Sequence, residues 1–268
     1  MSKSKRFIEI DIVKGIAVVF MVIFHFFYLS HFMKVKEYPI DSGILKFLAK
    51  SAHTTFIIMV GVNMAVSYQA NKKKKNSYDT YFGKQAKRAI FLLIAGTLVS
   101  YASYLGFGDL YVKFGIFHFI AAAIVLGQIF IDNKMIAMLG AIFIFLATIL
   151  VDKSSMFFYQ KCQNVPMTCF ITGFANIKYS SLDHFPLLPY LGYICLGIAI
   201  GHSLYNNVER VYPINLSDNT VDKLEENKLT KLLAMLGKNS LAIYFVHFPL
   251  FYFILKKYAS QGNISNLY

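Results

Sequence analysis

The first apolar segment of the chain carries three ionisable residues with a helical spacing. Asp11 and Lys14 are three residues apart, and His25 follows Lys14 by eleven residues. Eleven steps of about 100° make three turns plus about 20°, so Lys14 and His25 lie on one helix face, about 16 Å apart along the axis. Asp11 shares that face and can neutralise the ammonium group. A ligand with an anionic head and a reactive end could bridge this face; the alternative is an interfacial ion pair without further function.

Other imidazoles stand near the ends of later apolar segments. His118 precedes the small residues Ala121–Ala123, which allow close helix packing and would hold the imidazole inside a bundle. His247 lies in the last apolar segment. Asp183 stands beside His184, where a carboxylate can orient a basic histidine or cap the next helix. Each of these residues is a candidate for proton transfer, and a packed polar side chain is the alternative for each.

The composition indicates which elements position these residues. Of 268 residues, 56% are hydrophobic and only 15% are charged, and the mean hydropathy is +0.50. Soluble domains have about 25% charged residues. Apolar runs of about 20 residues recur, and each is long enough to cross a bilayer core of about 30 Å. The chain is therefore predicted to be a multi-pass membrane protein of the cell membrane.

We predict about seven transmembrane helices. Their approximate limits are residues 12–32, 44–67, 87–105, 114–131, 134–151, 185–204 and 239–255. The runs do not alternate as barrel strands would, so the fold class is an all-α polytopic bundle. No internal repeat or low-complexity linker divides the chain, so a single integral-membrane domain is expected over residues 1–268.

Basic residues are unevenly distributed between the two sides of this bundle. With the N-terminus in the cytoplasm, 17 of the 27 Lys and Arg residues lie inside, and Lys72–Lys75 contribute most of the excess. Seven spans then place the C-terminus outside. Six histidines fall in the outer half or at the outer surface: His25, His31, His53, His118, His184 and His247. This one-sided distribution favours a functional site, because ionisable groups at membrane depth are costly.

The remaining polar features exclude several classes of site. The net charge of +13 would suggest nucleic acid in a soluble protein, but membrane orientation and contact with anionic lipid explain it here, so no nucleic-acid partner is expected. No Cys/His spacing suggests a metal site. Cys162 and Cys169 share a predicted outer loop, where a disulfide and two reduced thiols are both open. The sequence leaves the oligomeric state open, a homo-oligomer included.

Four segments occur in the order found in a known family. They are Arg6–Asp11 with Lys14-Gly15 and His25, Phe114–His118, Phe185–Tyr193, and Leu236–Leu241 with His247-Phe248-Pro249. In these segments the chain resembles small prokaryotic membrane proteins that are similar to the catalytic region of heparan-α-glucosaminide N-acetyltransferase. The basic residue, ten-residue gap and histidine of the first segment also resemble the signature of the wider transmembrane acyltransferase superfamily.

The resemblance implies an enzyme that moves an acetyl group from cytosolic acetyl-CoA to a hydroxyl or amine of a glycan-like or cell-envelope acceptor outside. The CoA phosphates would meet Lys14, beside Asp11, and Arg88 at the inner side. His25 would be the general base. His118 or His247 would bind the thioester oxygen or shuttle a proton, and Asp183 would orient a histidine. In the animal enzyme the position matching His25 looks like Asn, with the catalytic histidine beyond it, so His31 is a rival base.

Two other functions remain open from the sequence. Buried histidines and carboxylates also build the proton relays of transporters, although the paired broken helices of many transporters are not evident here. A seven-helix structural or sensor protein with pH-responsive histidines is the third alternative. Bound CoA in the purified protein would separate the enzyme from both.

Overall fold

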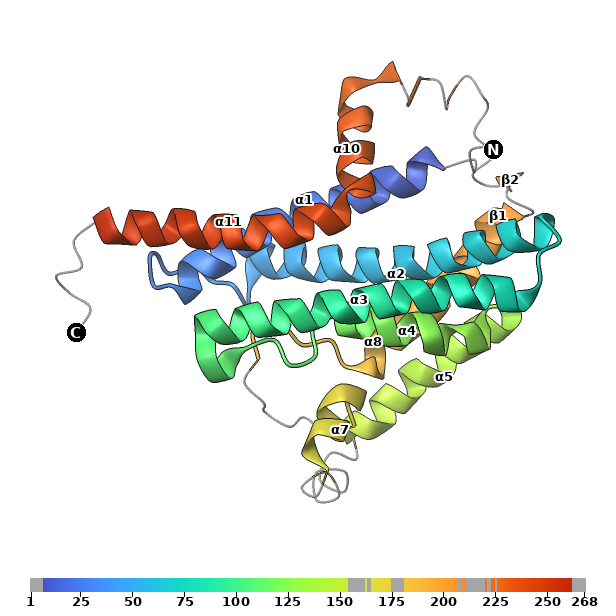
Figure 1. The fold of residues 1–268 in the computed structure, drawn as a ribbon, viewed down its shortest axis with the longest axis horizontal. Coiled ribbons are helices and arrows are strands. Elements are labelled where there is room, and N and C mark those ends of the chain that lie inside the picture. The colour runs from blue at the N-terminus through green and yellow to red at the C-terminus, as the bar shows by residue number, and fades with distance from the viewer. Residues whose placement is uncertain are drawn as a thin grey trace. The chain divides into compact units, whose positions relative to one another are not determined.

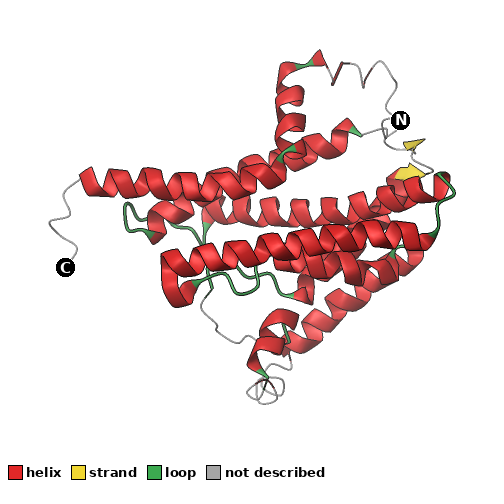
Figure 2. Cartoon of the chain, in the orientation of Figure 1, coloured by secondary structure: helices red, strands yellow, loops and turns green. Residues whose placement is uncertain are grey.

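The structure is a computed structural model that describes residues 7–153, 162, 165–174, 181–206, 209–210, 220, 223–224 and 226–261. Helices make up most of this part of the chain (Figure 2). In chain order the elements are α1 (Ile8–Phe32), α2 (Gly43–Lys73), α3 (Tyr78–Phe107), the 3-10 turn η1 (Gly108–Leu110), α4 (Ile116–Leu126), the 3-10 turn η2 (Gly127–Phe130), α5 (Lys134–Lys153), α7 (Pro166–Thr172), α8 (Leu187–Leu204), β1 (Tyr205–Asn206), β2 (Glu209–Arg210), α10 (Lys228–Lys238) and α11 (Ser240–Gln261) (Figure 1).

The predicted all-α polytopic fold is confirmed. In the described part of the chain, six helices are long and apolar enough to cross a membrane: Ile8–Phe32, Gly43–Lys73, Tyr78–Leu110, Lys134–Val151, Leu187–Leu204 and Ser240–Tyr258. Among the described residues, strand pairing is limited to the short antiparallel contact of β1 with β2 and an isolated parallel bridge between Phe114 and His184. The charge-based prediction that the N-terminus is cytoplasmic stays a prediction.

The fourth predicted span, residues 114–131, is shorter than the others. The structure forms an apolar helix over Ile116–Phe130, which falls below the length needed to cross the bilayer core unaided. Most side chains of α4 are buried, Phe119 and Ala123 completely, but Val125 is 46% exposed. A mostly buried apolar helix is expected in a core, and α4 packs against α3 and α8.

The chain forms two compact units. One, here called the terminal unit, comprises Met1–Met59 and Leu216–Tyr268; the other, the central unit, comprises Val60–Asn215. The terminal unit holds α1, α10, α11 and the beginning of α2, and the central unit holds the elements from the end of α2 to β2. The expectation of a single domain over residues 1–268 stays a prediction.

Small residues allow the helices of the central unit to approach closely. A Cβ atom added to Gly61 on α2 would lie 2.2 Å from the carbonyl oxygen of Ile194 and 2.9 Å from the Cα atom of Gly197 on α8. One turn further along, a Cβ atom on Gly201 would lie 2.7 Å from the Cβ atom of Ala65. Small residues four positions apart on both helices are typical of tightly packed membrane helices. This contact joins the end of α2 to α8.

Candidate functional site

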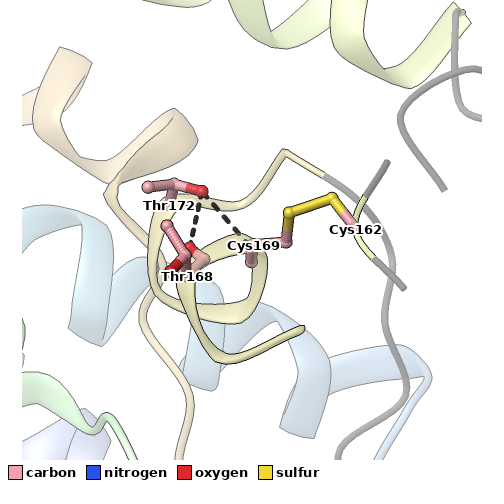
Figure 3. The surroundings of a disulfide bond; sticks show 4 residues. All are labelled: Cys162, Thr168, Cys169 and Thr172. Carbon is pink, nitrogen blue, oxygen red and sulfur yellow. Dashed lines mark hydrogen bonds between the residues drawn. A yellow bond between two sulfur atoms is a disulfide. The ribbon is translucent and has the colours of Figure 1, made fainter. Parts of the chain in front are cut away.

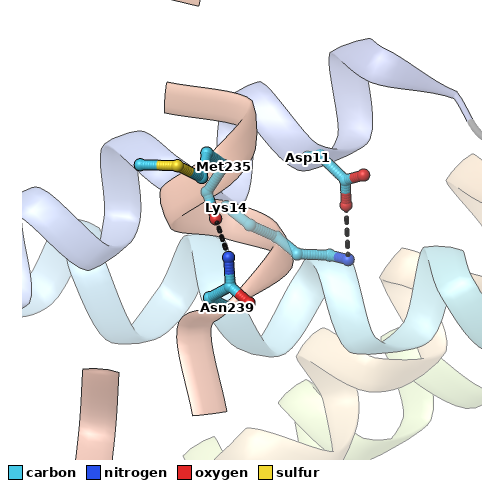
Figure 4. Close-up of polar contacts among 4 residues, drawn as sticks. All are labelled: Asp11, Lys14, Met235 and Asn239. Carbon is cyan, nitrogen blue, oxygen red and sulfur yellow. Dashed lines mark hydrogen bonds and ion pairs between the residues drawn. The ribbon is translucent and has the colours of Figure 1, made fainter. Parts of the chain in front are cut away.

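The first helix carries both ends of the predicted bridging face. The helix α1 is unbroken from Ile8 to Phe32, so the predicted separation of Lys14 and His25, about 16 Å along the axis, holds for a continuous helix. The Lys14 ammonium lies 3.4 Å from the Asp11 carboxylate, and both side chains are mostly buried (Figure 4). The Asp11–Lys14 contact expected from the spacing is thus confirmed. Its role in ligand binding stays a prediction.

The helix α10 crosses α1 beside this ion pair, and the crossing depends on two glycines. A Cβ atom on Gly15 would lie 2.0 Å from the carbonyl oxygen of Leu233, and one on Gly237 would lie 1.9 Å from that of Asp11. Figure 1 shows α10 steeply inclined to α1, and Figure 4 shows Met235 and Asn239 next to the Asp11–Lys14 pair. Gly15 and Gly237 both belong to the motifs quoted from the sequence. The close contact between α1 and α10 explains why glycine stands at both positions.

The hydropathy of the sequence does not predict α10. Its eleven residues are too few to cross a membrane. The available signal was amphipathic: leucines at 229, 232, 233 and 236 fall at helical spacing among Lys228, Lys231 and Lys238. Asn227 caps the helix, because its side-chain oxygen accepts hydrogen bonds from the backbone N–H groups of Leu229 and Thr230.

His25 and His247 meet side by side in the terminal unit. The Nδ1 atom of His25 lies 2.8 Å from the Nε2 atom of His247, and the two rings are stacked with centroids 5.0 Å apart. His247 is buried, with 5% of its surface exposed, and its Nδ1 atom lies 2.9 Å from the carbonyl oxygen of Ile243. His25 is partly exposed. The sequence singled out both histidines but gave no sign that they touch.

The rival base His31 has a different environment near the end of α1. Its Nδ1 atom accepts a hydrogen bond of 3.1 Å from the backbone N–H of Tyr38. This contact ties the end of α1 to the segment that follows it. The lone pair on Nδ1 is therefore already used by the fold.

His118 lies in the central unit, at the start of α4. Its imidazole packs against α3, where a Cβ atom on Gly96 would come within 2.9 Å of the ring. Gly96 thus makes room for the imidazole. The His118 Nδ1 atom is buried and has no hydrogen-bond partner among the described residues. Such an atom can serve a ligand, since a buried polar group without a partner is costly.

Asp183 caps α4. One carboxylate oxygen accepts a hydrogen bond of 3.0 Å from the backbone N–H of Ile116, and Gly115 leaves the space that this carboxylate occupies. The capping role considered from the sequence is therefore present, but the capped helix is α4 rather than the helix that follows Asp183. A catalytic role for Asp183 stays a prediction.

The neighbouring His184 is held by α7. Its Nε2 atom lies 2.8 Å from the carbonyl oxygen of Phe170, and its ring stacks on the Phe170 ring at 3.7 Å. Burial lowers the pKa of His184, although the hydrogen bond to the Phe170 carbonyl opposes that shift. His184 thus anchors the segment before α8.

The histidines of the central unit lie near the ends of its helices. His118 and His184 stand at the starts of α4 and α8. His202 stands near the end of α8, where its Nε2 donates to the Ile131 carbonyl and its Nδ1 accepts from Gln69.

Arg88, the second predicted phosphate ligand, is exposed on α3, and its guanidinium lies 3.4 Å from the Gln85 side-chain oxygen.

The structure decides between the disulfide and the two reduced thiols that the sequence left open. Cys162 and Cys169 form a disulfide beside α7 (Figure 3), whereas Cys195 is a buried free thiol. Thr172 donates a hydrogen bond of 2.8 Å to the carbonyl oxygen of Thr168 in the same short helix. In the described ranges, no group of three or more His, Cys, Asp or Glu residues is arranged to hold a metal ion.

Comparison with known proteins gives one match. The family model described as heparan-alpha-glucosaminide N-acetyltransferase, catalytic, matches residues 6–249. These residues include every candidate discussed above. Neither a curated protein nor a solved structure matches the chain significantly.

Proposed function

Because this chain belongs to the family of the heparan-alpha-glucosaminide N-acetyltransferase catalytic region, we propose that it transfers an acetyl group from cytosolic acetyl-CoA. The acceptor is a hydroxyl or amine of a glycan-like or cell-envelope molecule on the outer side of the membrane. One observation carries the proposal: α1 holds Lys14 near one end and, three turns on, His25 in contact with His247. The helix thus offers a cation and a base on one face.

Lys14 serves the anionic end of the donor. Acetyl-CoA carries phosphates at one end and a thioester at the other, joined by an extended arm. A separation of about 16 Å between cation and imidazole suits a ligand of this kind. Asp11 holds Lys14 in place until a phosphate binds.

His25 serves the reactive end as a general base. It removes the proton of the acceptor hydroxyl or amine while the acceptor oxygen or nitrogen attacks the thioester carbonyl carbon. The carbon–sulfur bond then breaks, and the CoA thiolate takes a proton from the imidazolium, which restores neutral His25. General base catalysis of this kind contributes about 10²–10⁴-fold.

The role expected for His118 from the family resemblance, to bind the thioester oxygen or shuttle a proton, stays a proposal. Its Nδ1 atom is buried and has no hydrogen-bond partner among the described residues, so it is available for such a role. The described residues offer no cysteine nucleophile, since Cys162 and Cys169 are joined and Cys195 is buried. Direct transfer therefore remains preferable to a covalent acyl-enzyme.

The test uses the full chain purified in lipid nanodiscs. Labelled acetyl-CoA is added with a panel of amino sugars and sugar alcohols, and the products are identified by mass spectrometry. We expect acetyl transfer by the wild-type protein and a loss of about 10²-fold or more in His25→Ala. Absence of acetyl-CoA binding in the folded wild-type protein would reject the acyltransferase and favour a transporter.

A further inference from the structure

The protons of the two contacting histidines can be assigned from the partner at the far end of the pair. His247 Nδ1 lies 2.9 Å from the carbonyl oxygen of Ile243, one turn earlier on α11. A carbonyl oxygen only accepts hydrogen bonds, so the Nδ1 atom of His247 carries a proton. In a neutral imidazole, the Nε2 atom of His247 then carries the lone pair.

This assignment fixes the proton of the other ring. The 2.8 Å contact joins His247 Nε2 to His25 Nδ1. Because His247 Nε2 is the acceptor, His25 Nδ1 must be the donor. The lone pair of His25 is therefore on its Nε2 atom, on the opposite side of the ring from His247.

We propose that His247 is a positioning residue that holds His25 in the tautomer protonated on Nδ1 and so makes His25 Nε2 the basic atom. The use of that atom as a catalytic base rests on the proposed function; the tautomer itself does not. The geometry supports this division, because His247 Nδ1 is occupied by the Ile243 carbonyl while His25 Nε2 lies on the side of its ring away from His247. His25 acts, and His247 sets its orientation.

The same pair stabilises the charge that base catalysis creates. When His25 Nε2 takes the proton of the acceptor, the existing bond from His25 Nδ1 to His247 Nε2 becomes charge-assisted and stronger. No other hydrogen bond has to break, since His247 Nδ1 continues to donate to Ile243. When CoA leaves, the proton on His25 Nε2 passes to the thiolate and the neutral pair is restored.

The first test reads the tautomers directly. The full chain is prepared with ¹⁵N-labelled histidine in nanodiscs near neutral pH, and His25→Gln and His247→Gln identify the two sets of signals. We expect a protonated Nδ1 and an unprotonated Nε2 in both rings, with a coupling across the hydrogen bond between them. A protonated Nε2 in neutral His25 would overturn the proposal whether or not the protein transfers acetyl groups.

The second test compares two replacements of the positioning residue. Gln at position 247 keeps an oxygen that can accept from His25 Nδ1, whereas Leu of similar volume has no acceptor. We expect kcat to fall about 10- to 100-fold in His247→Leu, in line with a lost hydrogen bond to a charged group. His247→Gln should recover most of that loss, and the affinity for acetyl-CoA should stay unchanged in both.

The two tests separate the possible failures. Equal kcat in the wild type and His247→Leu would overturn the positioning role. If His247→Leu fails to fold, the labelled wild-type protein still decides the tautomer. If the wild type transfers nothing although the expected tautomers are found, the proposed function fails while the assignment of the protons stands.

Discussion

Two histidines on one helix differ in what their nitrogen atoms are doing. His25 contacts His247 through Nδ1, which leaves Nε2 for the acceptor in the proposed mechanism, whereas His31 uses Nδ1 to accept from the Tyr38 backbone. The first arrangement resembles the orientation of a base by a second group, and the second resembles a structural contact at a helix end. At the scale of single residues, the environment therefore favours His25 as the base.

We predict that His25→Ala lowers the rate of acetyl transfer about 10²-fold or more, with little effect on folding. The matched control is His31→Ala, which removes an imidazole from the same helix. Turnover and thermal unfolding are measured for both proteins. Near-normal turnover in His25→Ala together with an inactive, folded His31→Ala would transfer the role of base to His31.

Lys14 gives a prediction about donor binding. Lys14→Ala should weaken acetyl-CoA binding by about 1.5–3 kcal/mol, the worth of a hydrogen bond to a charged group. Lys14→Arg should be tolerated, because either cation can meet a phosphate. Lys14→Glu should bind less tightly than Lys14→Ala, since it adds repulsion beside Asp11. Titration calorimetry on the purified proteins measures these affinities, and equal affinity in all variants would reject the bridging role of α1.

His184 gives a prediction about pH. Its pKa is lowered below the ordinary value of 6.5 in the folded protein, so the unfolded chain binds a proton at a higher pH than the folded chain does. The stability contributed by neutral His184 is therefore present above about pH 6.5 and lost as the pH falls through the folded-state pKa. The difference in thermal unfolding temperature between the wild type and His184→Gln should shrink as the pH is lowered from about 8 to about 5.5. A pH-independent difference would contradict this.

At the scale of elements, the crossing of α1 and α10 positions the cation end of the site. Gly237 touches the Asp11 backbone, and Gly15 touches the Leu233 backbone, so neither position has room for a Cβ atom. The position of the Asp11–Lys14 pair therefore depends on the close packing of α10 against α1.

We predict that Gly237→Ala destabilises the protein by about 1–3 kcal/mol, because the added methyl group would overlap the Asp11 carbonyl oxygen. The control is Gly83→Ala in α3, where a Cβ atom meets nothing within 4 Å. That change should be neutral or stabilising by up to about 1 kcal/mol, as expected for alanine in a helix. Chemical unfolding measures both changes. Equal stability of the two variants would argue against the crossing.

The elements themselves were predictable to different degrees. Hydropathy located each long helix, and the first predicted span, residues 12–32, lies inside the observed Ile8–Phe32. The spacing of Asp11 and Lys14 predicted their contact, because both residues are in one helix. The helix α10 was missed because an amphipathic segment of eleven residues has no membrane signal. The short length of α4 was missed because a mostly buried apolar helix has the hydropathy of a spanning one.

At the scale of the whole molecule, orientation in the membrane decides which side the acceptor approaches. We predict that Lys72–Lys75 are cytoplasmic and, counting residues 114–131 as a span, that the Cys162–Cys169 disulfide is external. This placement requires the short helix α4 to cross the membrane with the support of its neighbours. In intact cells, an impermeant thiol reagent should label the chain only after mild reduction. Buried Cys195 should remain silent, and a variant with Ser at 162 and 169 is the control. Labelling that requires opening the membrane would reverse the topology.

The site as a whole was predictable only in part. The sequence named His25 and His247 as separate candidates, because 222 positions separate them and no periodicity relates two helices so far apart. It left the cysteines undecided for a similar reason, since spacing alone does not show whether two thiols meet. The contact of Asp183 with α4 also required the fold, because the capped residue Ile116 lies 67 positions earlier.

The helix α1 meets α10 at Gly15 and Gly237, and it meets α11 at His25 and His247. These two contacts fix the number of residues between the glycine and the histidine in both stretches of the chain. Ten steps lead from Gly15 to His25, and ten lead from Gly237 to His247. One inserted residue in α1 would turn everything beyond it by about 100° and shift it by about 1.5 Å. Either the glycines or the imidazoles would then lose their partners. Relatives that keep both contacts should therefore have inherited these two stretches without insertions or deletions, while substitutions between the fixed points accumulate freely.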